Sequence, residues 1–194
     1  MSKTTTIDYK NIYFPPGGIL LWLIIFLELI TFSAALIALA IYSKEDPIAY
    51  HNSRLMLNST YGAINTIFLL TSGFFMATSM HQLKKGNFDK SRFYLKLTML
   101  GGLFFLALKS IEYSEKIAHG LTIGYDTFFT FYWMLTIFHV LHVLIGMVIL
   151  VSTYFSIKKK GADMKIEDAE AGAAFWHMCD LIWLLLFPVL YLIF

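Results

Sequence analysis

The chain has 194 residues, of which 58% are hydrophobic and only 14% are charged, whereas soluble domains carry about 25% charged residues. This composition excludes an ordinary soluble protein and is typical of an integral membrane protein. The formal net charge of +2 does not provide the concentrated basic surface of a nucleic-acid-binding protein. A single cysteine, Cys179, excludes an intramolecular disulfide and a thiolate metal cluster.

Five long apolar stretches predict an all-α fold, an integral membrane bundle of five transmembrane helices in a single domain spanning residues 1–194. The stretches cover about 19–42, 61–83, 93–116, 126–155 and 175–194. Each is long enough to cross a bilayer core of about 30 Å as a helix. The first is expected to be a retained span, because no cleavage signal of small residues follows a short apolar region. The segments between the stretches, including 43–59, are expected to be loops.

Glu28 lies in the middle of the first stretch. The helical rise of about 1.5 Å per residue places it about 14 Å into the core, close to the bilayer midplane. An isolated charge at this depth is costly, so the sequence predicts a protonated carboxyl that faces the bundle. Two interpretations stay open, a hydrogen-bonded packing residue and a group tied to proton or ion movement.

The fourth stretch contains His139 and His142, whose spacing of three positions places them near one another on one helix face. Such a pair could ligate a metal or a haem iron. Membrane metal sites in helix bundles use three or more converging ligands, however. We therefore expect hydrogen bonds across the bundle and no metal ligand in this chain.

Charged pairs also occur in the third and fifth stretches. Lys109 precedes Glu112 by three positions, and we expect a self-neutralising cluster that anchors the outer interface. His177 and Asp180 have the same spacing near the inner boundary and are expected to hold the last helix to its neighbours. Trp183 suits a membrane interface or a neighbouring subunit.

The distribution of Lys and Arg predicts the orientation in the membrane. If the N-terminus is cytoplasmic, eleven of the fifteen Lys and Arg residues fall on the inner side. The four on the outer side are Lys44, Arg54, Lys109 and Lys116. Because cytoplasmic segments carry the excess of Lys and Arg, we predict a cytoplasmic N-terminus and a periplasmic C-terminus.

Five motifs, in chain order, resemble those of subunit III of haem–copper respiratory oxidases. They are FLELITF (26–32), NTIFLLTSG (65–73), LKSIEYSEKI (108–117), TIFHVLHVLIG (136–146) and FWHMCDLIW (175–183). The family patterns are S-E-x-x-F-F, N-T-x-x-L-L-x-S-S, Q-x-x-E-Y-x-E, G-F-H-x-x-H-V-x-x-G, and an aromatic pair followed by His, Asp and Trp at intervals of three. The first motif places Glu28 on the family's intramembrane glutamate. The chain departs from the patterns at two positions. Lys109 stands where the family pattern has Gln, and Ile137 stands where the family often has Gly.

The resemblance implies the short five-helix bacterial form, because two N-terminal helices of the seven-helix members have no counterpart here. It implies a non-catalytic subunit of a bacterial aa3-type terminal oxidase, a proton-translocating enzyme of the cytochrome-c oxidase type in the aerobic respiratory chain. The resemblance then implies that partner subunits bind haem and copper. This chain is expected to bind neither. The chain would pack directly on subunit I, alongside subunit II and the other respiratory-complex subunits, in the cell inner membrane.

The same resemblance assigns supporting roles to the polar residues. Glu28 becomes proton-related, and the chain supports proton uptake, complex stability and phospholipid binding. Structural, lipid or subunit contacts are expected at Glu112, His139, His142, His177, Asp180 and Trp183.

Three alternatives remain beside this interpretation. The chain could be an accessory subunit of a quinol oxidase or nitric oxide reductase complex. It could be a stand-alone proton-coupled membrane transporter that uses Glu28. It could also be a membrane metalloenzyme centred on His139 and His142.

Overall fold

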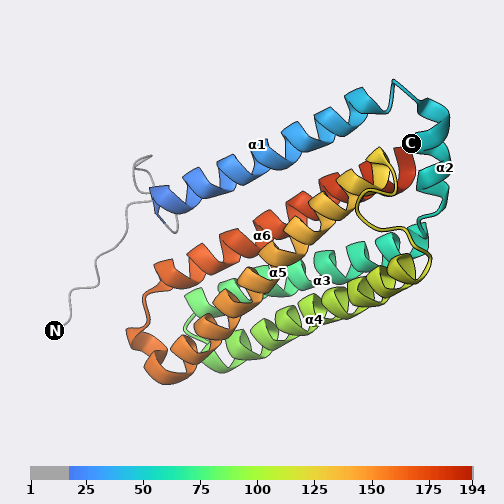
Figure 1. Ribbon diagram of the computed structural model, residues 1–194. Helices are drawn as coiled ribbons and strands as arrows, with labels where there is room; N and C mark the ends of the chain where they lie inside the picture. Colours follow the sequence, from blue (N-terminus) through green and yellow to red (C-terminus); the bar gives the residue numbers. More distant parts are fainter. Residues whose placement is uncertain (1–17, 194) are drawn as a thin grey trace.

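A computed structural model describes residues 18–193 of the chain (Figure 1). The elements are α1 (Ile19–Tyr42), α2 (Pro47–Leu55), α3 (Ser59–Lys84), α4 (Phe88–Ala118), α5 (Thr127–Lys160), the 3₁₀ turn η1 (Gly161–Asp163), α6 (Ile166–Pro188) and the π-helical turn η2 (Val189–Ile193). No strand occurs among these described residues. Five helices are long and apolar enough to cross a membrane, which confirms the predicted all-α membrane bundle.

Local capping signals set several helix starts. The side chain of Asp46 accepts a hydrogen bond from the Ala49 backbone N–H, and Pro47 takes the first position of α2. Asn58 and Asp126 cap α3 and α5 in the same way. A capping carboxylate followed by proline is a strong helix start. The prediction of a loop over 43–59 is therefore wrong at α2.

The last membrane helix begins at Ile166, well before the predicted boundary at Phe175. The added turns, with the sequence IEDAEAGAA, combine alanines with acidic residues near the positive end of the helix, which favours a helical start. Glu170 in this extension is buried and forms an ion pair of 2.6 Å with Lys84 at the end of α3. The extension is a polar continuation of the span, and a search for apolar residues alone misses it.

Helices α3 and α4 pack as a close antiparallel pair. The Ser79 hydroxyl donates to the Ser91 carbonyl oxygen at 2.9 Å, and the Ser72 hydroxyl donates to the Thr98 carbonyl oxygen at 2.8 Å. A Cβ placed on Gly101 would lie 2.8 Å from the Ser72 Cβ. Small residues and interhelical hydrogen bonds are the usual means of joining helices in a bilayer.

Trp176 of α6 fills the centre of the bundle. A Cβ placed on Gly102 of α4 would lie 2.6 Å from its indole, and one placed on Gly146 of α5 would lie 2.9 Å away. The indole Nε1 also donates to the Ser72 hydroxyl of α3 at 3.1 Å. One side chain therefore contacts three other helices, and the two glycines provide the space for it.

Helix α1 lies at the edge of the bundle and packs against α5 and α6 (Figure 1). Only 17% of its most apolar window is buried, compared with 50% of that of α6. Its buried side carries Ile25, Phe32, Leu36 and Leu39, whereas Thr31 is exposed. Most of the α1 surface is therefore available to lipid or to another chain.

Candidate functional site

Glu28 of α1 and His142 of α5 face each other where these helices meet. The imidazole Nε2 lies 3.3 Å from the carboxyl Oε2, outside hydrogen-bond geometry. The side chains are 16% and 9% exposed, and the rings of Phe32 and Phe138 lie 5.8 and 4.7 Å from the imidazole. The carboxyl thus faces the bundle, and its partner comes from another helix.

The Phe138 carbonyl fixes which nitrogen of His142 faces Glu28. Nδ1 lies 2.7 Å from this carbonyl oxygen, and because a carbonyl only accepts, Nδ1 carries a hydrogen. Nε2 is left facing Oε2. The carboxyl oxygen and this ring nitrogen are thus adjacent without a hydrogen bond between them. Chemically, the arrangement places two groups of proton-binding type next to each other at a contact between two membrane helices.

His139 does not share this environment. Its ring stacks on Trp183 with centroids 5.4 Å apart and meets the edge of Phe105 at 5.6 Å. Within residues 18–193, neither of its buried ring nitrogens has a hydrogen-bond partner. The two histidines differ by about 60° around a helix of 3.6 residues per turn, which is enough to direct them to different neighbours. Over the same range, no group of three or more His, Cys, Asp or Glu residues could hold a metal ion.

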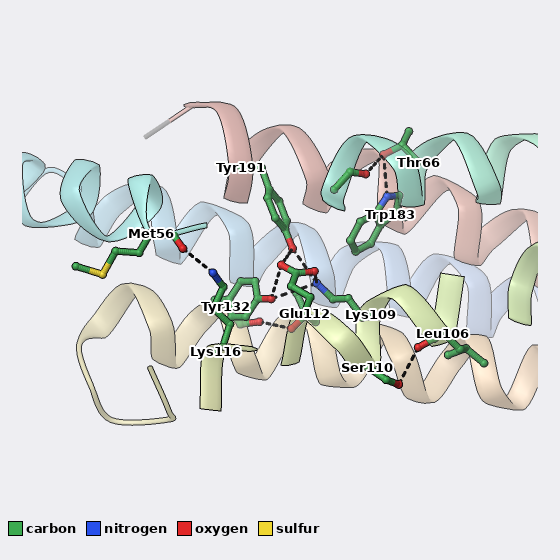
Figure 2. Close-up of polar contacts among 12 residues, drawn as sticks. Met56, Thr66, Leu106, Lys109, Ser110, Glu112, Lys116, Tyr132, Trp183 and Tyr191 are labelled. Atoms are coloured by element: carbon green, nitrogen blue, oxygen red, sulfur yellow. Dashed lines mark hydrogen bonds and ion pairs between the residues drawn. The ribbon is translucent and has the colours of Figure 1, made fainter. Parts of the chain in front are cut away.

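A charged cluster lies inside the bundle at the end of α4 (Figure 2). We call Lys109, Glu112, Tyr132 and Tyr191 the Lys109 cluster. The Lys109 Nζ donates to Glu112 Oε2 at 2.9 Å, to the Tyr191 hydroxyl at 2.8 Å and to the Tyr132 hydroxyl at 3.3 Å. Both hydroxyls in turn donate to Glu112 Oε1, at 2.6 Å from Tyr191 and 2.9 Å from Tyr132.

The Lys109 cluster is enclosed and its hydrogen bonds are complete. Lys109 is 1% exposed and Glu112 is fully buried. All three ammonium hydrogens have acceptors, and four aromatic rings lie with their centroids between 5.0 and 5.4 Å from Nζ. The structure therefore places the predicted self-neutralising pair inside the bundle, and its role as an anchor at the outer interface stays a prediction.

His177 and Asp180 lie at the contact between α6 and α3. The His177 Nδ1 is 3.4 Å from Asp180 Oδ2, and this carboxylate lies directly against Gly73 of α3. Trp183, further along α6, is 1% exposed and donates its Nε1 to the Thr66 hydroxyl at 2.9 Å. Its contacts are thus with the chain's own core, whereas the sequence suggested a membrane interface or a neighbouring subunit.

Sequence reasoning missed the two tyrosines of the Lys109 cluster. Tyr132 and Tyr191 come from α5 and η2, and no spacing relates them to Glu112 of α4. The one available signal was the Lys109–Glu112 pair itself, because a buried charge pair needs further hydrogen-bonding partners.

Comparison with known proteins gives one consistent family. The family model described as cytochrome c oxidase subunit III matches residues 19–193. Cytochrome c oxidase subunit 3 of Artemia franciscana is 34% identical over 128 residues, which are 66% of this chain and 49% of the relative. Cytochrome c oxidase subunit 3 of Corynebacterium diphtheriae is 28% identical over 187 residues, which are 92% of this chain and 89% of the relative.

A third relative joins two subunits in one chain. The heme-copper oxidase subunit I+III of Aeropyrum pernix is 25% identical over 183 residues, which are 89% of this chain and 22% of the relative. The chain spans about half the length of the animal relatives it matches and most of the length of the corynebacterial one.

Proposed function

This chain belongs to the cytochrome c oxidase subunit III family, and from that premise we propose that it is the non-catalytic subunit III of a bacterial aa3-type terminal oxidase. It is a multi-pass protein of the inner membrane. In this proposal partner subunits hold the haem and copper and reduce oxygen. This chain packs on subunit I, stabilises the complex, binds lipid and supports proton uptake. The Aeropyrum relative supports the contact with subunit I, because its name assigns both subunits to one polypeptide.

The pair of Glu28 and His142 carries the proposal for proton uptake. An ionised carboxylate alone in the hydrocarbon core is costly, whereas a carboxyl and an imidazole that share one proton can change charge state by a short transfer. Glu28 lies on α1, whose most apolar window is the least buried among the five membrane-spanning helices that the structure describes. A neighbouring subunit that covers α1 would therefore lie close to a group able to take up and return a proton.

Glu28→Gln in the intact complex tests this role. Glutamine keeps the shape and the hydrogen bonding but cannot release a proton. We expect normal assembly and electron transfer, with a modest loss in proton delivery or in activity over many turnovers. The loss should stay below about tenfold, because removing a group that takes part in acid–base chemistry costs about 10²–10⁴-fold. Oxygen consumption, proton release and inactivation are measured in parallel, with Thr31→Val on the exposed side of α1 as the control.

Two results would contradict this assignment. Complete loss of oxidase activity with intact haem spectra would make Glu28 catalytic. If none of the three measurements changes, Glu28 is only a packing residue.

Purification in mild detergent separates the proposal from the other functions. Elution without a haem protein would favour a stand-alone transporter. The identity of the largest co-purified subunit distinguishes a cytochrome c oxidase from a quinol oxidase or nitric oxide reductase.

A further inference from the structure

Two tyrosines inside the bundle share one carboxylate oxygen. The Tyr191 hydroxyl of η2 donates to Glu112 Oε1 at 2.6 Å, and the Tyr132 hydroxyl of α5 donates to the same oxygen at 2.9 Å (Figure 2). Tyr191 is 1% exposed and Tyr132 is fully buried, and their ring centroids lie 6.3 Å apart. We call Tyr132 and Tyr191 the tyrosine pair. Both phenols are therefore shielded from water and point at the same proton acceptor.

A tryptophan connects the tyrosine pair to the surface of the bundle. The Trp133 and Tyr132 rings have their centroids 5.8 Å apart and meet edge to face. Trp133 also lines an apolar groove of about 510 Å³, together with Ile123 and other residues of α5. Its Nε1 donates to the Leu121 carbonyl oxygen at 2.8 Å, which fixes the indole against the connection between α4 and α5. Because aromatic rings in contact exchange electrons readily, Trp133 provides an electron path between the groove and the tyrosine pair.

Glu112 supplies what a tyrosine needs to give up an electron reversibly. A phenol that loses an electron becomes a strong acid, so a base within hydrogen-bond reach must take its proton. Both hydroxyl-to-carboxylate distances lie within the range of about 2.6–3.2 Å that proton transfer requires. The Lys109 ammonium binds the other carboxylate oxygen, Glu112 Oε2, at 2.9 Å. This contact leaves Oε1 to the two hydroxyls.

Lys109 determines which kind of radical the tyrosine pair can form. Its Nζ lies 5.0 Å from the ring centroid of Tyr132 and 5.4 Å from that of Tyr191. This positive charge opposes a second positive charge on either ring, so a radical cation is unfavourable. A neutral tyrosyl radical leaves the ring uncharged, because the proton departs with the electron. The geometry therefore favours an oxidation that is coupled to proton transfer, with Glu112 as the acceptor.

We propose that the tyrosine pair is a redox site that takes up one oxidising equivalent through Trp133. One electron passes from Tyr132 through Trp133 to a strong one-electron oxidant, the Tyr132 O–H bond breaks, and the proton moves to Glu112 Oε1. The products are a neutral tyrosyl radical, a protonated Glu112 and the oxidant reduced by one electron. Tyr191 exchanges with Tyr132 by the same step through the shared carboxylate oxygen. A one-electron reductant reverses the oxidation, and Glu112 returns the proton to the phenolic oxygen.

This inference rests on the proposed function only for the source of the oxidant. A neighbouring subunit that reduces oxygen generates strong one-electron oxidants, and the tyrosine pair would supply them with an electron. The experiment below introduces an oxidant of its own and does not measure oxygen consumption. The redox site and the proposed function therefore fail separately.

A photo-oxidant attached beside Trp133 tests the redox site in the assembled complex. Thr122 is exposed and follows Leu121, so Thr122→Cys can carry a ruthenium polypyridyl maleimide next to the indole. The parent variant also contains Tyr113→Phe and Tyr125→Phe, because Tyr113 stacks on Trp133 at 4.7 Å and Tyr125 is exposed on the same connection. A flash, with an irreversible electron acceptor in the buffer, leaves the label as a strong one-electron oxidant. Transient absorption then records the tyrosyl radical, and the same complex without Thr122→Cys gives the background from other cysteines.

We expect a tyrosyl radical in the parent and its loss when Tyr132→Phe and Tyr191→Phe are combined, because phenylalanine keeps the ring and lacks the O–H bond. Trp133→Phe should also abolish the signal although both tyrosines remain, because phenylalanine is much harder to oxidise than tryptophan. Radical formation should be slower in heavy water, since the O–H bond breaks in the same step. Tyr61→Phe is the matched control: its hydroxyl also donates to a carboxylate, that of Glu115 at 2.7 Å, but it is not a member of the pair, and the signal should remain.

Four results would contradict the redox site. No radical in the parent, or an equal yield in the double variant, would leave the tyrosines as partners of a buried charge pair only. An equal rate in heavy water would overturn the proton transfer to Glu112, and a signal retained in Trp133→Phe would overturn the electron path. The parent and Trp133→Phe keep the whole Lys109 cluster, so they decide the matter even where the double variant fails to assemble.

Discussion

Lys109 and Glu112 form a charge pair that is almost completely removed from water. The spacing of three positions predicted the pair, but its surroundings come from α5, α6 and η2, whose packing no local pattern specifies. The same limit applies to Glu28: its depth in the bilayer showed that it needs a partner, and only the packing of α1 on α5 identified His142. Sequence thus indicated which residues need partners, and the fold supplied the partners.

Removing one member of the buried pair should be more harmful than removing both. Lys109→Leu leaves the Glu112 carboxylate uncompensated, and we expect a destabilisation of about 3–5 kcal/mol. Lys109→Leu combined with Glu112→Leu should recover much of this loss, because no unpaired charge remains. Thermal denaturation of the detergent-purified complex measures both variants.

Two controls accompany this comparison. Lys109→Gln introduces the residue that the family pattern carries and keeps hydrogen-bond donors, so it should lie between the wild type and Lys109→Leu. Lys85→Leu removes an exposed lysine and should have little effect. A double variant less stable than Lys109→Leu would contradict the account of the pair as a compensated charge.

At the scale of elements, apolar length predicted five spans but placed some of their ends poorly. The polar start of α6 and the short helix α2 depend on alanine content, capping and ion pairing, and a hydropathy pattern does not register these features. Asn65, Ser72, Gly73 and Ser79 form a stripe of small and polar residues along α3, and all four are buried. Small and polar residues in a membrane helix thus indicated the packed face more reliably than apolar residues did.

The contact of Trp176 with two glycines makes the bundle sensitive to added volume at these positions. Gly146→Val places branched carbons against the indole, and we expect a loss of about 1–3 kcal/mol in stability through overpacking. Ala107→Val on the exposed face of α4 is the control. The melting temperature and the yield of assembled complex report the effect. Equal values for the two variants would show that the helices around Trp176 accommodate the added carbons without strain.

At the scale of the whole molecule, the sequence predicted the fold class and the order of the spans. It did not predict that α1 would stand at the edge, because all five stretches are apolar enough to lie anywhere in a bundle. Hydropathy favours burial in lipid and burial in protein alike. The edge position follows from the small and polar residues of α3, α4 and α6, which pack those helices closely and leave α1 with the mainly apolar contacts of α5 and α6.

Orientation is the property of the whole molecule that the Lys and Arg distribution predicts. Cysteines at Lys159 and Thr122 lie at opposite ends of the bundle, and the native Cys179 is buried and gives no background. Because segments rich in Lys and Arg stay in the cytoplasm, a membrane-impermeant maleimide added to intact cells should label Thr122→Cys and not Lys159→Cys. After the cells are opened, both should react, which controls for accessibility. If only Lys159→Cys is labelled in intact cells, the orientation in the membrane is the opposite of the predicted one.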